Sequence, residues 1–330
     1  MSDSFPKFNR FSFHLALALL AAAMVSPLHA DMALTPAGVG DGFTLSTYAS
    51  GFPNNGAVGP VGITFESGGQ VMVSSYANGL IDVFATDTDG QIYSGGTLSA
   101  TNYGGGNPAG LATTGGKFYL AEQGSGAVVE VDANGNFVQT IVTGVPAATG
   151  IIADPINGHL FVSTLGNNVI WDVDPIAKTK TAFVFESADG LTIAPDGSVL
   201  YAEVGGHILG FNTTTKVQVF DSGPISGVDG TAIGFGSLAG NIFANTNFGQ
   251  LVEVNLTTDV QTVIGTGGSR GDLVSVDPNG SLLLTQTSTV LRLTPSSGGS
   301  FTPIPEPSTL LMLGTGLLGL GGSIKRKFFS

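Results

Sequence analysis

Cysteine is absent from the 330-residue sequence, and its absence excludes several classes of protein. Without thiols the chain cannot form disulfides, bind a metal through thiolates or use a cysteine nucleophile. The fold must therefore be stabilised without covalent cross-links.

Charged residues are also scarce, at 11% of the chain, whereas 42% of the residues are hydrophobic and 50 are glycine. A disordered acidic chain would show the opposite balance of hydrophobicity and charge. Long charged helices are excluded as well, because each glycine inside a helix costs roughly 1 kcal/mol. The composition predicts an all-β protein with many tight turns.

Basic residues are few, since 11 Lys and Arg stand against 24 Asp and Glu. When the terminal segments described below are set aside, 6 basic and 22 acidic residues remain, and the net charge is about −16. Such a surface repels phosphate backbones, so nucleic acid is excluded as a partner. Cations, neutral glycans and basic proteins are compatible with it.

Residues 1–30 have the pattern of a secretory signal peptide. Lys7 and Arg10 precede an apolar run over 15–25, and Leu28-His29-Ala30 provides a cleavage-like end. The pattern predicts export and a mature chain that begins near Asp31. The alternative is an uncleaved anchor, for which the run is short because a membrane span needs ~20 residues.

Residues 305–330 form a tail of three parts. Pro305, Glu306 and Pro307 are followed by an apolar run over 310–324 and then by Lys325-Arg326-Lys327. As a helix, the apolar run is ~22 Å long, which is marginal against ~30 Å of hydrocarbon. The basic cluster should remain in the cytoplasm and leave the preceding chain outside.

This tail resembles the PEP-CTERM sorting signal of Gram-negative bacteria, residue by residue over 305–309 and in the order of its parts. The resemblance implies recognition by an exosortase-type processing enzyme and cleavage near the motif. It also implies that the C-terminal helix anchors the chain transiently in the membrane before delivery to the cell surface or exopolysaccharide matrix. A plain single-pass anchor is the alternative.

A unit of about 40 residues recurs six times. Each unit opens with a glycine that an aliphatic residue follows closely, at Gly62, Gly110, Gly150, Gly190, Gly230 and Gly271. Apolar runs of period two, such as 71–73 and 80–84, follow each glycine and are separated by turns. Four short strands per ~40 residues are typical of a propeller blade. We therefore predict an all-β, six-bladed β-propeller, with a signal helix before it and a transmembrane sorting helix after it.

The sixth unit has no fourth strand after Thr294. Residues 43–48 carry the missing pattern, so we expect them to complete the sixth blade and close the ring. The alternative is an incomplete or five-bladed ring with 301–304 as an edge strand. Unit one is longer than the others within 87–107, where we expect a longer loop or a strand extension.

Two units resemble known propeller repeats. Pro60-Val61-Gly62-Ile63 and the runs after it resemble an NHL repeat, whereas 189–191 with 195–203 resembles the gluconolactonase superfamily. The resemblance covers roughly 43–294 and implies a six-bladed propeller, but fold alone does not fix an activity.

Two positions per unit are candidates for the central channel. The residues before the unit glycines are Val61, Ala109, Thr149, Asp189, Asp229 and Arg270, and those ending the second run are Ser75, Glu122, Thr164, Glu203, Asn245 and Gln286. Five of these could form an oxygen-rich site for a hard cation such as Ca²⁺, namely Glu122, Asp189, Glu203, Asp229 and Asn245. A water-filled channel with polar rims is the alternative.

The lactonase resemblance implies metal ligands at channel positions, and Asp189 and Glu203 match two of them most closely. Val58-Gly59-Pro60 lacks the acidic residue expected there, and Glu203 stands where aspartate is usual. Both departures argue against lactone hydrolysis.

The remaining polar motifs indicate structure rather than chemistry. His159 and His207 have no partner at metal-ligand spacing, so we expect structural roles for them. Streptogramin lyases, which are propellers of similar pattern, use a channel histidine that neither residue matches. Asp87-Thr88-Asp89-Gly90 and Asp132-Ala133-Asn134-Gly135 resemble incomplete calcium loops and are expected to be hairpin turns. No catalytic residue is assigned.

The sequence thus predicts a signal peptide (1–30), a linker (31–42), a propeller (43–294), a second linker (295–304) and a sorting signal (305–330). We expect an exported protein of a Gram-negative surface or matrix that binds exopolysaccharide or surface proteins or supports them structurally. The alternative is a divalent-metal-dependent, lactonase-like hydrolase with its site in the channel. Converging carboxylates would favour the hydrolase.

Overall fold

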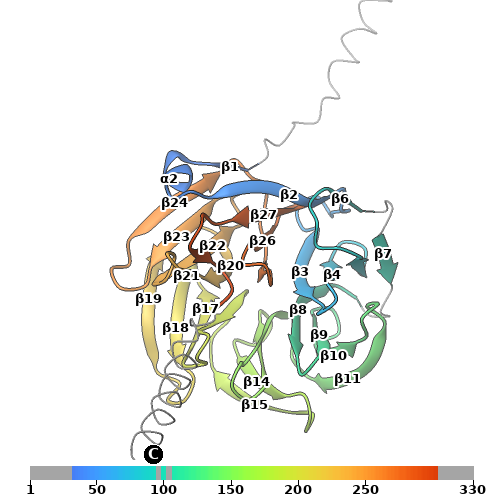
Figure 1. Cartoon of the computed structure of the whole chain (residues 1–330). Helices are drawn as coiled ribbons and strands as arrows, with labels where there is room; N and C mark the ends of the chain where they lie inside the picture. Colours follow the sequence, from blue (N-terminus) through green and yellow to red (C-terminus); the bar gives the residue numbers. More distant parts are fainter. Residues whose placement is uncertain (1–31, 94–97, 102–105, 304–330) are drawn as a thin grey trace, which may run out of the picture.

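Six sheets, antiparallel except for one outer strand pair, surround a central axis in the computed structural model of the protein (Figure 1). The structure describes residues 32–303, apart from 94–97 and 102–105. The arrangement confirms the six-bladed propeller that the repeat predicts. The expected signal and sorting helices lie outside the described residues, and within these residues no helix is long and apolar enough to cross a membrane.

The first four blades follow the chain in order. They consist of β3 (Pro60–Phe65), β4 (Val71–Ser75), β5 (Leu80–Phe84) and β7 (Leu98–Thr101); β8 (Pro108–Thr114), β9 (Lys117–Glu122), β10 (Ala127–Val131) and β11 (Phe137–Thr143); β12 (Ala148–Ala153), β13 (Leu160–Thr164), β14 (Ile170–Asp174) and β15 (Thr179–Val184); and β16 (Leu191–Ile193), β17 (Val199–Val204), β18 (His207–Asn212) and β19 (Gln218–Pro224). The first strand of each blade contacts the first strands of its neighbours, so these strands form the wall of the channel.

The last two blades each include strands from distant parts of the chain. Blade five contains β20 (Val228–Ile233), β22 (Asn241–Thr246), β23 (Leu251–Asn255), β24 (Gln261–Thr266) and β1 (Ala33–Leu34). Blade six contains β25 (Val274–Val276), β26 (Leu282–Thr285), β27 (Thr289–Thr294), β2 (Thr44–Ser50) and β6 (Gln91–Ile92). A two-stranded ribbon joins β21 (Phe235–Gly236) to β28 (Gly299–Ser300).

The ring is closed by the strand that the sequence predicts for this role. β2 pairs antiparallel with β27, with Thr44 opposite Thr294 and Leu45 opposite Leu293. Blue β2 accordingly lies beside red β27 in Figure 1. The blade-six edge is thus paired, which removes a template for aggregation. The alternative of an open or five-bladed ring is wrong.

Both segments expected to be linkers pack onto the ring within the described residues. β1 pairs with β24, and the short helix α2 (Pro36–Gly40) follows it, capped by the Thr35 hydroxyl, which accepts from Gly38 N–H at 3.3 Å. In the C-terminal linker, β28 is followed by Phe301, which is fully buried. Apolar residues at 32 and 301 account for this, because burying them removes apolar surface from water.

The longer loop of unit one crosses to blade six, where β6 pairs in parallel with β2. The expectation of a hairpin turn at Asp87–Gly90 is therefore wrong, whereas Asp132–Gly135 does form the turn between β10 and β11. Asp87 and Asp89 instead accept hydrogen bonds from the buried Arg292 guanidinium at 2.5 and 2.7 Å. Asp277 and Ser281 bind the same guanidinium, so the two acidic side chains fasten the loop to blade six.

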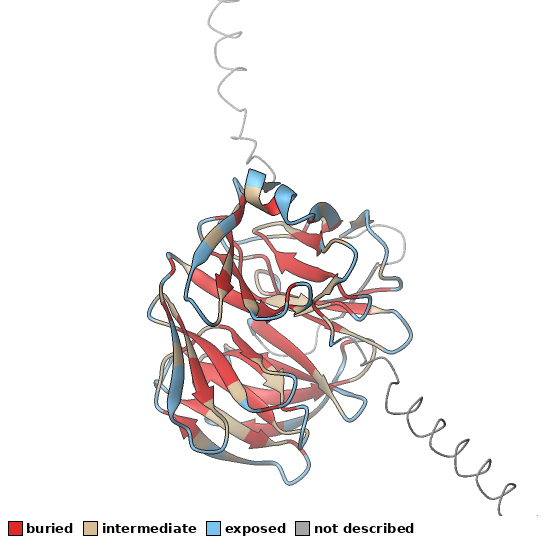
Figure 2. Ribbon diagram, turned by 60° about the vertical axis from the view of Figure 1, so that its left-hand side comes forward, coloured by how far each residue is buried: buried red, intermediate tan, exposed pale blue. Residues whose placement is uncertain are grey.

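Apolar side chains between neighbouring blades form the core. Each of the six blade-to-blade interfaces holds its own cluster. In Figure 2 the buried residues lie mostly on strands, whereas the connecting loops are mostly exposed. At the closing interface, Tyr48 is fully buried and its ring lies 5.6 Å from that of Phe84. Its hydroxyl donates to the Thr86 carbonyl at 3.2 Å.

Tyr48→Ala should lower the free energy of unfolding by about 3–5 kcal/mol, because the truncation leaves a cavity where blade six meets blade one. Chemical denaturation of the mature protein measures this change. Thr44→Ala, at the exposed start of β2, is the matched control and should shift stability by less than about 0.5 kcal/mol. A Tyr48→Ala protein as stable as the control would contradict the closing role of β2.

Candidate functional site

Glycine recurs in the innermost strands because neighbouring blades approach each other there. A Cβ on Gly190 would lie 2.1 Å from the Asp229 carbonyl oxygen of the next blade, and one on Gly150 would lie 2.5 Å from that of Asp189. Gly62, Gly110 and Gly230 face the next carbonyl in the same way. Only glycine fits such a close approach, which gives the sequence repeat its physical cause.

Polar side chains of the second strand bind the same carbonyls. The Ser74 hydroxyl donates to the Ala109 carbonyl at 2.5 Å, and that of Ser163 donates to the Asp189 carbonyl. In blade five, the Asn245 amide donates to the Asp272 carbonyl at 3.1 Å. These hydrogen bonds join neighbouring blades around the channel.

The residue before each glycine faces the channel, as the sequence predicts. A cavity of about 220 Å³ opens at the end of the channel where the inner strands begin, and we call it the polar mouth. Its lining includes Val61, Ala109, Thr149, Asp189, Asp229 and Arg270, which confirms this set of channel positions. Val58, Tyr76, Gln123, Leu165 and Asp272 complete the lining.

Asp272 is a mouth carboxylate that the sequence analysis missed. The carbonyl of Asp229 faces Gly190 of the preceding blade, and the carbonyl of Asp272 faces Gly230 in the same way. Asp272, and not Arg270, is therefore the blade-six residue that corresponds to Asp189 in blade four. Leu273 therefore occupies the glycine position of blade six, and alignment on Gly271 is wrong by two residues. The pattern Asp272-Leu273-Val274-Ser275-Val276 beside Asp189-Gly190-Leu191-Thr192-Ile193 is the signal that would have found it.

The second set of expected channel positions lies away from the cavity. In three blades, strand register places a second-strand residue opposite the inner glycine position, namely Ser74, Ser163 and Thr285. The residues expected to face the channel in these blades, Ser75, Thr164 and Gln286, each lie one residue further along the second strand. Glu122 is displaced in the same way, because Leu111 pairs with Leu120 and Ala121 comes next. A shift of one residue along a strand turns a side chain to the opposite face.

The five residues expected to bind a cation are consequently divided. Asp189 and Asp229 line the polar mouth, and Glu203 lies buried directly behind them. Glu122 instead accepts from Gly106 N–H and from the Ser125 hydroxyl, at 3.0 and 2.5 Å. The Asn245 amide group is occupied by two backbone carbonyls. Within the described parts of the chain, no three acidic or histidine side chains are grouped to hold a metal ion.

One cation lies among the acids of the polar mouth. Arg270 donates to Asp272 Oδ1 through Nη2 at 2.6 Å and through Nε at 3.0 Å. Its Nη2 lies 3.6 Å from Asp229 Oδ2. The Asp229 side chain is only 1% exposed, and neither of its oxygens accepts a hydrogen bond from a described residue. Burial, then the charges of Asp189 and Asp272, raise the pKa of Asp229 well above its ordinary value.

Burial also governs the two carboxyl groups beside Asp229. It raises the pKa of Asp189 to about 6, with a further contribution from the charge of Asp272. It raises the pKa of Glu203 to about 8. Glu203 Oε1 accepts from the Thr231 hydroxyl at 2.5 Å, and Oε2 has no described partner.

The position of Glu203 explains why it should be protonated. It occupies the place where Ser74, Ser163 and Asn245 donate to the carbonyl of the next blade. A carboxyl group can donate only when it is protonated. The raised pKa of Glu203, about 8, favours the neutral form at pH 7, which has the proton that this position requires.

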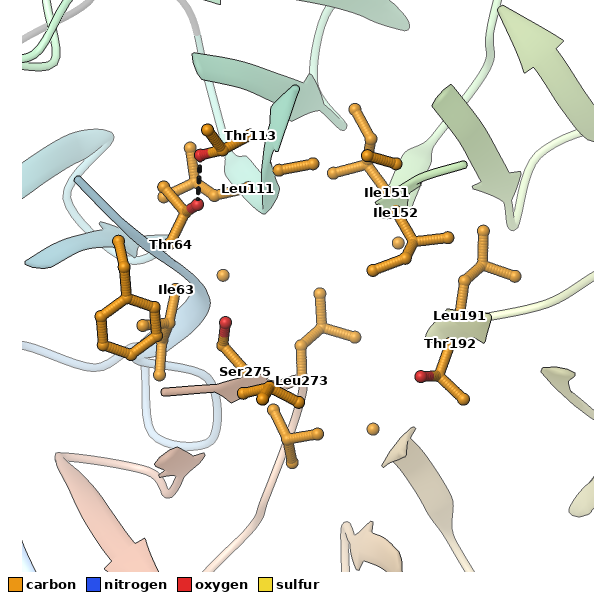
Figure 3. A pocket seen from close by; sticks show the side chains of 18 of the residues that line it. Ile63, Thr64, Leu111, Thr113, Ile151, Ile152, Leu191, Thr192, Leu273 and Ser275 are labelled. Carbon is orange, nitrogen blue, oxygen red and sulfur yellow. Dashed lines mark hydrogen bonds between the residues drawn. The ribbon is translucent and has the colours of Figure 1, made fainter. Parts of the chain in front are cut away.

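A second cavity, of about 290 Å³, opens at the other end of the channel, and we call it the apolar mouth. None of the described residues that line it is charged, and aliphatic side chains such as Ile63, Leu111 and Leu191 surround it (Figure 3). The Thr64 and Thr113 hydroxyls are hydrogen-bonded to each other at 2.7 Å on its wall. Val61, Ala109 and Leu273 form a buried apolar cluster between the two mouths.

Neither histidine that drew attention in the sequence reaches the mouths. His159 Nδ1 lies 2.8 Å from Asp172 Oδ1, and His207 Nδ1 lies 2.7 Å from Asp221 Oδ1. Their partners belong to β14 and β19, the third and fourth strands of their blades. The expected structural role of both histidines agrees with these contacts.

The C-terminal tail matches a known family. Residues 303–327 match the PEP-CTERM protein-sorting motif. The chain is therefore an exported propeller protein whose motif implies sorting to the cell surface by an exosortase. No curated protein sequence matches the chain.

Solved structures share the propeller fold at low sequence identity. A luciferin-regenerating enzyme aligns with a TM-score of 0.61 and 11% identity over 79% of this chain and 98% of its own. A virginiamycin B lyase of Staphylococcus aureus, bound to quinupristin, aligns with a TM-score of 0.52 and 14% identity over 76% of this chain and 99% of its own. An auxiliary nutrient binding protein of Bacteroides thetaiotaomicron aligns with a TM-score of 0.57 and 10% identity over 76% of each chain. These likenesses show the fold alone.

Glu203→Gln should make stability less dependent on pH. The pKa of Glu203 is raised from 4.5 to about 8 in the folded protein, so its contribution is present below pH 4.5 and is lost as pH rises towards 8. Without this carboxyl group, the free energy of unfolding should fall less steeply as pH rises from 4.5 to 8, by up to about 1.4 kcal/mol per pH unit. The glutamine amide also supplies the donor that the position requires.

Denaturation of the mature protein from pH 4 to pH 9 measures this difference. Glu66→Gln, in the turn after β3, is the control and should follow the wild type. Asp82 and Asp189, whose pKa values are about 7 and about 6, should leave a remaining slope of the same sign. Parallel curves for Glu203→Gln and the wild type would show that Glu203 is ionised in the folded state.

Proposed function

We propose that the mature protein is a binding protein of the cell surface or its exopolysaccharide matrix, and that its ligand site is the polar mouth of the channel. The observation that carries the proposal is the place where the sorting tail begins. The Thr302 hydroxyl donates to the Asp277 carbonyl at 2.8 Å, and Phe301 N–H donates to the Gly280 carbonyl at 2.9 Å. The chain thus leaves the ring at the turn that follows β25.

That turn lies at the apolar mouth, because Pro278 forms part of the apolar lining. Residue 303 therefore ends on the side of the apolar mouth, and in the proposed arrangement this side is the one nearer the bilayer while the precursor is anchored. A ligand of the extracellular matrix can reach the polar mouth both before and after the tail is processed.

The chemistry of the polar mouth suits a polyhydroxylated ligand. Asp189, Asp229 and Arg270 provide hydrogen-bonding groups on one side, and Tyr76 lies on the opposite side. The Tyr76 hydroxyl donates to Gln123 Oε1 at 2.6 Å, which fixes both side chains. Gln123 also lines an adjoining cavity of about 260 Å³ beside Ala147. Convergent polar groups next to an apolar wall are typical of small-ligand sites, and the neighbouring cavity leaves room for a second unit of a polymer.

The alternative is a lactonase-like hydrolase, which requires a divalent cation. Such a cation would depend on Asp189, Glu203 and Asp229, since Glu122 and Asn245 are engaged elsewhere. The hydrolase would be supported if calcium raised the melting temperature of the mature protein and if Asp189→Asn abolished this increase. The binding function requires no such response.

Replacing Pro305, Glu306 and Pro307 by alanine should keep the chain in the membrane with its tail attached, because the exosortase loses its recognition element. Fractionation of producing cells and the mass of the recovered protein measure retention and processing. Ser297→Ala, upstream of the motif, should be processed like the wild type. Normal processing of the triple variant would favour a plain anchor.

Tyr76→Ala should weaken binding of the mature protein to purified exopolysaccharide from the producing cells by about tenfold, or ~1.4 kcal/mol. The reason is the loss of the aromatic wall of the polar mouth and of the contact that orders Gln123. Co-sedimentation measures the affinity. Ser275→Ala, at the apolar mouth, is the control and should bind like the wild type. Equal binding by both variants would place the matrix contact elsewhere.

A further inference from the structure

The polar mouth contains a buried carboxylate without a matched partner. Asp229 is 1% exposed and lines the cavity, yet neither of its oxygens accepts a hydrogen bond within the described chain. The guanidinium at 3.6 Å is directed to Asp272, which it binds through two nitrogens. Buried charges in proteins are ordinarily both paired and hydrogen-bonded. The ion pair with Arg270 at 3.6 Å gives Asp229 no hydrogen bond, so a ligand could supply the missing cationic donor.

The net charge of the polar mouth also indicates a ligand with a cationic group. Asp189, Asp229 and Asp272 line one side, and among the described residues of the lining Arg270 is the only one with a cationic side chain. Arg270 offsets one carboxylate and leaves the mouth net negative. A neutral ligand would leave this charge unmatched, whereas a ligand with one positive group would compensate it.

The opposite wall indicates that the ligand is larger than a simple ion. Val58, Val61, Ala109 and Leu165 line it together with Tyr76. These residues provide apolar contact and no carboxylate ligands for a metal. Arg270 would repel a divalent cation beside Asp229 about twice as strongly as a cation with a single charge at the same place. A ligand that fits has an apolar face on one side and a cationic donor with hydroxyl groups on the other.

We propose that the polar mouth binds a hexosamine with a free amino group, with its ammonium between Asp189 and Asp229 and its ring against the apolar wall. This inference rests on the proposed function and names the ligand class of the same site. The ring hydroxyls face Thr149, Gln123 and Arg270, which also line the cavity. Acetylation of the amino group would remove the charge that the site selects.

Calorimetric titration of the mature protein at pH 7 tests the proposal with glucosamine, glucose, N-acetylglucosamine and calcium chloride. Glucosamine should bind at least about tenfold more tightly than either neutral sugar, since charge-assisted hydrogen bonds are about twice as strong as neutral ones. The titration is repeated at pH 6, where the amino group of glucosamine is charged and Asp189, whose pKa burial raises to about 6, is about half protonated, so binding the ammonium should release protons. The observed enthalpy should therefore depend on the buffer for glucosamine and not for glucose.

Asp229→Asn separates binding from folding. The substitution keeps the shape of the side chain and removes its charge, so glucosamine affinity should fall at least about tenfold. Stability at pH 8 should stay equal or rise, because a buried unpaired charge is removed. Asp196→Asn, in the exposed turn between β16 and β17, is the matched control and should change neither quantity.

Three outcomes would overturn the hexosamine assignment. Equal affinity for glucose and glucosamine would indicate a neutral-sugar site, and calcium binding that excludes glucosamine would indicate a metal site. Failure of every sugar to bind, while the protein still binds matrix polysaccharide through Tyr76, would leave the proposed function standing without this ligand. If Tyr76→Ala also left matrix binding unchanged, the proposed function would fall with it.

Discussion

The close approach of inner strands around the channel is the constraint on which the rest of the structure depends. At Gly190 the backbone of one blade comes so near the Asp229 carbonyl of the next that no side chain fits between them. That carbonyl is buried and needs a donor, which the second strand supplies in other blades through Ser74, Ser163 and Asn245. The close approach of glycine to the next carbonyl recurs in the first five blades, and in three of them a second-strand donor adds a hydrogen bond that joins neighbouring blades.

The same constraint places the side chains of the candidate site. Because the carbonyl before each glycine points towards the neighbouring blade, the side chain of that residue points into the polar mouth. Carboxylates at this position in three successive blades, Asp189, Asp229 and Asp272, therefore meet at one end of the channel. Their burial opposes stability, as the raised pKa values of Asp189 and Asp229 indicate. Such a concentration of unfavourable charge is typical of binding sites.

The two ends of the propeller domain have different roles. The N-terminal segment closes the ring, whereas the C-terminal segment leads away from it towards the sorting motif. β2 returns from the start of the chain to pair with β27, and Arg292 holds the unit-one loop against the same blade through Asp87 and Asp89. The chain then leaves at the turn beside Pro278, on the apolar side. The polar mouth thus lies at the opposite end of the channel from the place where the described chain ends.

The sequence by itself determined the six-bladed fold, the closing role of residues 43–48 and the sorting tail, because glycine spacing, period-2 runs and the terminal motif are local signals. It also identified Asp189 and Asp229, which precede the repeating glycine. Only the tertiary structure decided that Glu122 faces away from the channel and that Asp272 enters it, since a strand pattern does not fix register to one residue. The pairing of Arg292 with Asp87 joins residues 205 apart, and no local pattern encodes such a contact.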